Sequence, residues 1–409
     1  MEETMKQKAK KKKWTRERHR IVRNILNAVL RPYARIKYGI RVEKFCAQEN
    51  RPYLILFNHQ TPFDQFFVGM SFRGAVYYLA TEDIFSKGWV SSLIKYLVAP
   101  IPIKKQTTDV KAILNCIRVA KEGGTIAIAP EGNRTYSGRT EYMSPSIVPL
   151  ARKLNMPIAL YRIEGGYGVE PRWSDVTRRG KMRSYVARVI EPEEYKGMTD
   201  DELFEAIREG LYVDEAKVDG EYRHKKSAEY LERAIYVCPF CGLSTFESHG
   251  DVVECQKCHR KVHYLPTKEL QGEGFDFPFR FVAEWYDDQA EFINGVDVTE
   301  YCEAPMYCDF VELRNVIPYQ KKEVLSACAE VALYGNRVEI KRENETLLLP
   351  FDEVSAAAVL GRNKLNLYHD DRIYQLKGNK RFNALKYVHI YHRYKNIKKG
   401  EQDGKFLGL

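Results

Sequence analysis

The stretches NHQTPFD (residues 58–64) and PEGNR (residues 130–134) decide how the first half of this chain folds. In the first stretch, His59 precedes Asp64 by five positions, which pairs a potential general base with a group that can orient it. The second stretch places an acid, a glycine and an arginine on one short turn, which suits an anionic substrate. Each stretch alone is a weak signal, so the interpretation depends on their order and spacing.

Short apolar runs directly precede both stretches. Residues 53–57 and 125–129 are typical of buried strands, and residues 109–121 between them have a helical pattern. A strand pattern at residues 157–163 and a helical pattern at residues 200–212 follow. This alternation predicts an α/β domain with a sheet covered by helices. Both stretches come just after strand ends, where such sheets usually bind ligands.

The histidine and the aspartate have the chemistry to activate an alcohol. An alcohol attacks a thioester poorly unless a base removes its proton. His59 can act as that base near neutral pH, and Asp64 can fix its tautomer and stabilise the imidazolium that forms. An H-x4-D pair is common by chance, however, and a buried or capping histidine is the usual alternative.

Residues in and near the second stretch suit a phosphate group. Arg134 is a permanent cation with a forked donor, and Gly132 permits a turn that lets the backbone approach a ligand. Lys104 and Lys105 follow another strand pattern and can supply further phosphate contacts. The alternatives are a salt-bridged loop for the turn and a solvated basic face for the two lysines.

Residues 35–212 resemble the glycerolipid acyltransferase family, the PlsC-like enzymes that acylate 1-acyl-sn-glycerol 3-phosphate. The family's first block, N-H-x4-D, is matched at residues 58–64. Its second block ends a strand with a basic residue and is matched loosely at residues 103–105. Its third block, F-P-E-G-T-R, reads A-P-E-G-N-R at residues 129–134, and its fourth keeps one proline of two at residues 156–160. These departures fall on the acceptor side of the family's site.

The resemblance implies an O-acyltransferase that moves a fatty acyl chain from acyl carrier protein or coenzyme A to a lysophospholipid. Lysophosphatidic acid, giving phosphatidic acid, is the first expected acceptor; another lysophospholipid or an envelope component is the alternative. His59 is then the general base and Asp64 its partner, and no acyl-enzyme is implied. The residues expected to bind substrate or shape its site are Asn58, Lys104, Lys105, Glu131, Gly132 and Arg134.

Four of the nine cysteines form two C-x-x-C pairs with thirteen residues between the pairs. This spacing predicts a closed, structural zinc site, with iron in a rubredoxin-like site as the alternative. The nine cysteines are not an even disulfide set, and the paired units indicate metal binding in a reducing compartment rather than disulfide bridges. The predicted ligands are Cys238, Cys241, Cys255 and Cys258.

The net charge of +10 indicates an anionic partner. A basic run at residues 6–20 precedes an amphipathic helical pattern at residues 21–40, which Pro32 is expected to break or kink. Such a segment can lie on an anionic membrane, although a surface helix packed on the next domain is the alternative. With neither a signal peptide nor a transmembrane segment evident, we expect a cytoplasmic protein, peripheral on the inner face of the cell membrane.

A rival interpretation is a non-catalytic, zinc-ribbon nucleic-acid-binding or regulatory protein with a degenerate acyltransferase domain. The complete set of motif residues argues against degeneracy, and the ribbon has no run of aromatic residues for base stacking, so no nucleic acid is expected. The C-terminal part alternates short strands and turns and ends in a helical pattern at residues 385–394, an order similar to that of pleckstrin-homology or GRAM-like folds.

The chain is therefore divided into six regions. The expected regions are a basic amphipathic membrane-associating segment (1–40), an acyltransferase domain (41–212), a charged helical connector (213–235), a zinc ribbon (236–266), an aromatic-rich linking region (267–324) and a β-rich accessory domain (325–409).

Overall fold

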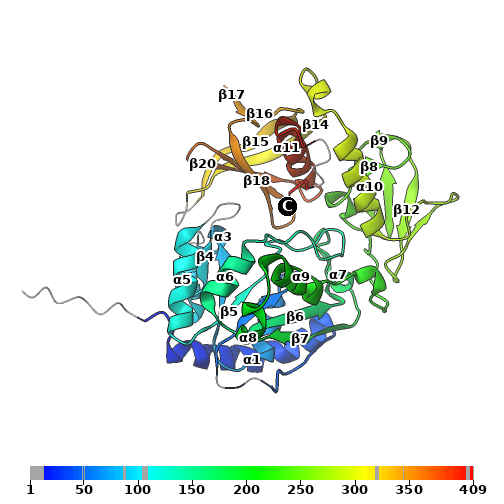
Figure 1. Ribbon diagram of the computed structural model, residues 1–409. Helices are drawn as coiled ribbons and strands as arrows, with labels where there is room; N and C mark the ends of the chain where they lie inside the picture. The colour runs from blue at the N-terminus through cyan, green and yellow to red at the C-terminus, as the bar shows by residue number, and fades with distance from the viewer. Residues whose placement is uncertain are drawn as a thin grey trace, which may run out of the picture.

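The computed structural model describes residues 13–47, 49, 51–85, 89–103, 109–317, 322–343, 345–401 and 406–408. Figure 1 shows an α/β domain in blue to green at the bottom, a β-rich C-terminal domain in yellow to red above it, and a small β unit in light green to the right of the C-terminal domain. Within the described ranges, no helix is long and apolar enough to cross a membrane.

The α/β domain is built on a seven-stranded sheet in the order β1-β7-β6-β2-β5-β3-β4. Only the β6–β7 pair is antiparallel; the other paired strands are parallel. The strands are β1 (Ile40–Val42), β2 (Leu54–Phe57), β3 (Val76–Thr81), β4 (Ile101–Ile103), β5 (Thr125–Ile128), β6 (Ile158–Glu164) and β7 (Met182–Ile190).

Helices cover both faces of this sheet because successive side chains of each strand point to opposite sides. Leu54 and Leu56 of β2 lie in a core shared with α5, α6 and α9, whereas Ile55 and Phe57 lie in a core shared with α1 and α2. The predicted α/β fold is therefore confirmed. The helices of this domain are α1 (Glu17–Tyr38), α2 (Asp64–Ser71), α3 (Glu82–Phe85), α4 (Trp89–Val98), α5 (Val110–Lys121), α6 (Ile147–Leu154), α7 (Gly166–Val169), α8 (Pro192–Lys196) and α9 (Asp200–Leu211).

Helix α1 continues through Pro32, which does not end it. The helix ends instead at Tyr38, where Gly39 takes a left-handed conformation (φ 60°) and donates its backbone N–H to the carbonyl of Arg35. Glycine adopts this conformation without steric cost, which is why the helix stops there.

The connector at residues 213–235 was predicted to be helical, but it forms no α-helix in the structure. It contains two short 3-10 turns, η1 (Glu215–Lys217) and η2 (Leu231–Arg233). Its charged side chains are used by other parts of the fold: Glu215 accepts a hydrogen bond from the backbone N of Gly165, and Arg233 donates to the carbonyls of Trp173 and Lys380. Tertiary contacts of this kind override a local helical preference.

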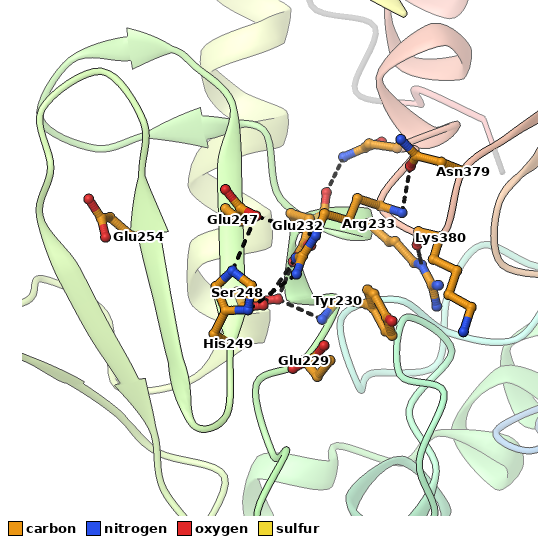
Figure 2. Close-up of polar contacts among 12 residues, drawn as sticks. Glu229, Tyr230, Glu232, Arg233, Glu247, Ser248, His249, Glu254, Asn379 and Lys380 are labelled. Carbon is orange, nitrogen blue, oxygen red and sulfur yellow. Dashed lines mark hydrogen bonds and ion pairs between the residues drawn. The ribbon is translucent and has the colours of Figure 1, made fainter. Parts of the chain in front are cut away.

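Figure 2 shows the turn η2 between the cysteine-bearing unit and the C-terminal domain. Glu232 accepts a hydrogen bond from the hydroxyl of Ser248 on one side and pairs with Arg381 on the other. Arg233 forms an ion pair with Asp175 of the α/β domain (Nη1–Oδ1 2.7 Å). The connector therefore joins the three units through buried polar contacts.

The cysteine-bearing unit is a four-stranded antiparallel sheet in the order β10-β11-β12-β13, with a separate β8–β9 pair. It extends beyond residue 266, the predicted end of the ribbon, because β13 pairs with β12. Its strands are β8 (Val237–Cys238), β9 (Gly242–Leu243), β10 (Phe246–His249), β11 (Val252–Cys255), β12 (Lys261–Tyr264) and β13 (Leu270–Gly272).

The C-terminal domain is a seven-stranded antiparallel sheet in the order β17-β16-β15-β14-β20-β19-β18, with helix α11 (Leu385–Lys398) packed against β18. Its mostly β character is as predicted, and the closing helix begins at the expected residue. The strands are β14 (Tyr307–Asn315), β15 (Glu323–Leu333), β16 (Arg337–Lys341), β17 (Thr346–Pro350), β18 (Val354–Leu360), β19 (Lys364–His369) and β20 (Arg372–Gly378).

The boundary predicted at residue 325 was wrong. Strand β14 lies before it and pairs with both β15 and β20, so it is a central strand of the C-terminal sheet. The expected linking region at 267–324 is therefore folded: it supplies β13, helix α10 (Val282–Gly295), the turn η3 (Val298–Tyr301), β14 and the start of β15. The sequence pattern missed this because strand pairing joins residues far apart in the chain.

Candidate active site and metal centre

His59 lies in the loop after β2, and Asp64 is the first residue of α2. The histidine Nδ1 is 2.8 Å from Oδ2 of the aspartate. The Asp64 side chain is completely buried, whereas the His59 side chain is 25% exposed. Because the carboxylate holds a proton on Nδ1, Nε2 is the ring nitrogen able to accept one from a substrate. The predicted pair is thus in contact, and its histidine is accessible.

The Asp64 carboxylate is held by further donors from the loop that precedes it. The backbone N–H of Gln60 donates to Oδ2 (2.7 Å), that of Thr61 donates to the same oxygen (3.0 Å), and the Thr61 hydroxyl donates to Oδ1 (2.6 Å). These bonds fix the orientation of the carboxylate toward His59. Sequence reasoning did not single out Thr61, although a threonine three residues before an aspartate at a helix start is a local signal.

Glu131 ties the two motif loops together. Its Oε1 accepts the backbone N–H of His59 (2.8 Å), and its Oε2 accepts that of Glu141 (2.8 Å). Burial raises the pKa of the Glu131 carboxyl to about 8, against the opposite effect of these two N–H donors. The backbone N–H of Thr135 also donates to the carbonyl of His59 (3.2 Å). These contacts favour a role for Glu131 in shaping the turn over contact with the acceptor.

Asn58 has its amide engaged inside the fold. Its Nδ2 donates to the carbonyl of Ile163, and its Oδ1 accepts the N–H of the same residue, both at 2.8 Å. The residue is buried at the end of β2. This arrangement favours positioning of the His59 loop against β6 over the direct substrate contact that we predicted.

The structure describes only some of the residues that were predicted to bind an anion. Lys104 and Lys105 lie outside the described residues. Gly132 is exposed, has φ of +68° and would meet no atom within 4 Å if it carried a Cβ. Arg134 follows it, and its Nη1 is a buried atom without a hydrogen-bond partner within the described structure. This orphaned donor is the feature of the turn that most clearly suits an anion.

Two more arginines lie beside Arg134, and sequence reasoning missed both. Arg172, in the loop after α7, donates to the backbone carbonyl of Arg134 (2.9 Å). Arg362 comes from the C-terminal domain and pairs with Glu170 (2.7 Å). Burial, with the charges of Arg172 and Arg362, lowers the pKa of Arg134 to about 10. No local pattern could have found Arg362, because it is over 200 residues away from the motif turn.

The four predicted ligand cysteines come together, with their Sγ atoms all within 4.8 Å of one another. The Sγ atoms of Cys238 and Cys258 are 3.7 Å apart, and those of Cys241 and Cys255 are 3.6 Å apart. A tetrahedral ion with metal–sulfur bonds of about 2.3 Å requires sulfur–sulfur separations of about 3.8 Å. The geometry of this cluster therefore fits a four-coordinate metal ion.

Comparison with known proteins identifies similar proteins for the part of the chain that holds both motif loops. Residues 39–162 match the family model described as Acyltransferase, a range that contains both motif loops. Over these residues, which include the histidine–aspartate pair, the chain is thus similar to acyltransferases of the PlsC-like kind. One curated relative is the 1-acyl-sn-glycerol-3-phosphate acyltransferase of Bacillus subtilis, which is 21% identical over 136 residues. That alignment covers 33% of this chain and 65% of the relative, slightly under two thirds of its length.

Two solved structures were also found to be similar to parts of this chain. The lysophosphatidate acyltransferase PlsC from Thermotoga maritima has 20% identity and a TM-score of 0.40, with 48% of this chain and 80% of that chain covered. The N-terminal PH domain of human ARAP2 has 14% identity and a TM-score of 0.18, with 22% and 81% covered.

Proposed function

We propose that this protein is an O-acyltransferase that moves a fatty acyl chain from a thioester donor to the free hydroxyl of a lysophospholipid. The contact between His59 Nδ1 and Asp64 Oδ2 carries the proposal, because it prepares Nε2 as a base beside a motif turn that suits an anion. The family match over residues 39–162 supports the same reaction class.

The proposed chemistry is direct transfer. Nε2 of His59 removes the proton of the acceptor hydroxyl as its oxygen attacks the thioester carbonyl carbon. Asp64 stabilises the imidazolium that results. The tetrahedral intermediate then expels the thiolate of the donor, which takes the proton from His59, so that an ester and a free thiol are formed and the base is regenerated.

Lysophosphatidic acid is the proposed acceptor, and phosphatidic acid the product. The orphaned Nη1 of Arg134 supports this choice, because a guanidinium binds phosphate oxygens with well-directed hydrogen bonds. Lys104 and Lys105 stay predicted phosphate contacts. A different lysophospholipid or an envelope component is the alternative acceptor. Acyl carrier protein and coenzyme A are both anionic donors, which suits the net charge of +10.

An anionic membrane surface on the inner face of the cell membrane is the proposed place of action. Helix α1 exposes a stripe of apolar side chains that includes Ile25, Val29 and Ile36, and the neighbouring α4 exposes Trp89 and Leu93. A cavity of about 210 Å³ lies near the start of α1. The basic side chains that line it can bind lipid phosphates. It is lined by Lys13, Trp14, Arg16, Arg18, His19, Lys95, Ala99 and Arg118.

For the cysteine cluster we propose a structural zinc ion, held by Cys238, Cys241, Cys255 and Cys258. Four thiolates complete a tetrahedral shell and leave no open position for a substrate. The ion would fix the small β unit, and no step of the acyl transfer passes through it. Iron is the alternative with the same ligands, and metal analysis of the purified protein distinguishes the two.

The deciding experiment incubates the protein with lysophosphatidic acid and labelled acyl-CoA or acyl carrier protein in liposomes, followed by mass spectrometry of the lipids. We expect phosphatidic acid from the wild-type protein and none from His59→Ala. His263→Ala is a matched control, since His263 also pairs with an aspartate (Nδ1–Oδ2 3.0 Å to Asp251) but lies in the cysteine-bearing unit. Near-wild-type turnover by His59→Ala would refute the mechanism.

A further inference from the structure

The C-terminal domain meets the motif turn of the acyltransferase domain at the end of β18 and at the turn that follows it, residues 361–363. Arg172 makes this junction. Its side chain donates to the backbone carbonyl of Arg134 (2.9 Å), and on the other side to those of Val359 (3.3 Å) and Gly361 (3.4 Å). Arg172 is only 2% exposed. Arg172 therefore holds the two domains together at the PEGNR turn.

This junction places the guanidinium of Arg362 beside the same turn. Its Nη2 is 2.7 Å from Oε1 of Glu170, and its Nη1 is 3.6 Å from Oδ1 of Asp175. The Arg362 side chain remains 28% exposed, so a ligand can approach it from solvent. The charge of Arg362 acts on Arg134, whose pKa it helps to lower.

Hydrogen-bond donors at this junction are left without partners. Within the described part of the chain, Nη1 of Arg134 and Nε of Arg362 are buried and make no hydrogen bond. Arg134 also takes part in none of the ion pairs between described residues. A buried donor without a partner is energetically unfavourable, and more so when it is charged. An incoming anion would give these two donors a hydrogen-bond acceptor.

We propose that Arg362 is an acceptor-binding residue and that, with Arg134, it holds the phosphate monoester of the lysophospholipid between the two domains. This inference rests on the proposed function and assigns part of the substrate site to the C-terminal domain. Two guanidinium groups on one anion favour a doubly charged phosphate monoester over a singly charged phosphodiester. The C-terminal domain thus contributes to the choice of acceptor.

The test is steady-state kinetics of Arg362→Gln with lysophosphatidic acid as the varied acceptor and a saturating acyl donor. We expect KM for the acceptor to rise about 10-fold or more, with kcat within about 3-fold and KM for the donor unchanged. Arg362→Lys keeps the positive charge but lacks the forked guanidinium. Its KM for the acceptor should therefore lie between those of the wild-type protein and Arg362→Gln. Arg337→Gln is the matched control, since Arg337 lies in the same domain and pairs with Glu339 within β16.

Glu170→Gln separates anion binding from domain docking, because it breaks the same ion pair and leaves the guanidinium of Arg362 in place. Anion binding predicts that only Arg362→Gln raises KM. Equal effects of the two variants, or an unchanged KM in Arg362→Gln, would overturn the inference.

A second measurement does not depend on turnover. Calorimetric titration with glycerol 3-phosphate should show binding to the wild-type protein that is weakened about 10-fold in Arg362→Gln and unchanged in Arg337→Gln. If no acyl transfer is found but this difference is present, the proposed function fails and the anion site stands. Equal binding of glycerol 3-phosphate by all three proteins would reject the anion site.

Discussion

The backbone N–H of His59 donates to the carboxylate of Glu131 at 2.8 Å, across 72 positions of the chain. The same carboxylate accepts the N–H of Glu141 through its other oxygen. One buried acid therefore fixes the loop that carries the base relative to the turn that carries Arg134. This contact explains how two motifs from different strand ends come to form one site.

Asp64→Asn should abolish most activity without loss of the fold. An asparagine can present its amide N–H to His59 Nδ1 in place of an acceptor, which selects the wrong tautomer and removes the stabilising charge. We expect kcat to fall by about 100-fold to 10,000-fold with little change in acceptor KM. Initial rates and circular dichroism of the variant measure both effects. Activity within a few fold of wild type would show that the pair is structural.

Asn58→Ala should affect stability more than substrate binding. The change leaves the backbone N–H and carbonyl of Ile163 without their partners in a buried position. We expect the free energy of unfolding to decrease by about 1–3 kcal/mol. Urea unfolding measures this, and acceptor KM is measured where the variant is folded. A raised KM with wild-type stability would restore the direct substrate contact that the sequence suggested.

Stability should depend on pH through Glu215. Burial raises the pKa of this carboxyl to about 7, although the nearby charge of Lys268 acts in the other direction. Between the ordinary pKa near 4.5 and pH 7, the folded state therefore binds more protons than the unfolded state. The free energy of unfolding then falls as pH rises through this window. Above pH 7 the contribution is constant.

Glu215→Gln removes this titration with little change of shape. The side-chain oxygen can still accept the N–H of Gly165, as Oε1 does now (2.8 Å). Relative to wild type, we expect the variant to gain on the order of 3 kcal/mol between pH 4.5 and 7. Urea unfolding at several pH values measures it, and Glu291→Gln, at an exposed site on α10, should run parallel to wild type. If the free energy of unfolding of Glu215→Gln changes with pH in parallel with that of wild type, the raised pKa of Glu215 is contradicted.

Metal removal should unfold the cysteine-bearing unit. We expect one zinc ion per chain by elemental analysis, and a lower melting temperature with a chelator or in Cys258→Ser, because the metal bonds stabilise this unit. Cys308→Ser, at an exposed cysteine outside the cluster, is the control. A full complement of bound metal in Cys258→Ser, with an unchanged melting temperature, would count against the four-thiolate site.

Much of the site was predictable because its signals are local. The apolar runs before His59 and Pro130 end as β2 and β5, two neighbouring parallel strands whose ends must meet at one edge of the sheet. The cysteine spacing similarly limits how the two pairs can meet. The predictions failed where a residue's partners are distant: β14 was taken for a linker, and residues 213–235 for a helix, because neither pattern shows what packs against it.

The sequence by itself determined the alternation of strands and helices, the histidine–aspartate pair and the four cysteines, since periodicity, capping and ligand spacing act over a few residues. Only the tertiary structure decided that the side chains of Asn58 and Glu131 form hydrogen bonds with backbone groups. It also decided that Arg172 and Arg362 lie beside Arg134. The physical reason is that burial and hydrogen-bond partnership depend on chain segments brought together by packing, which no local pattern contains.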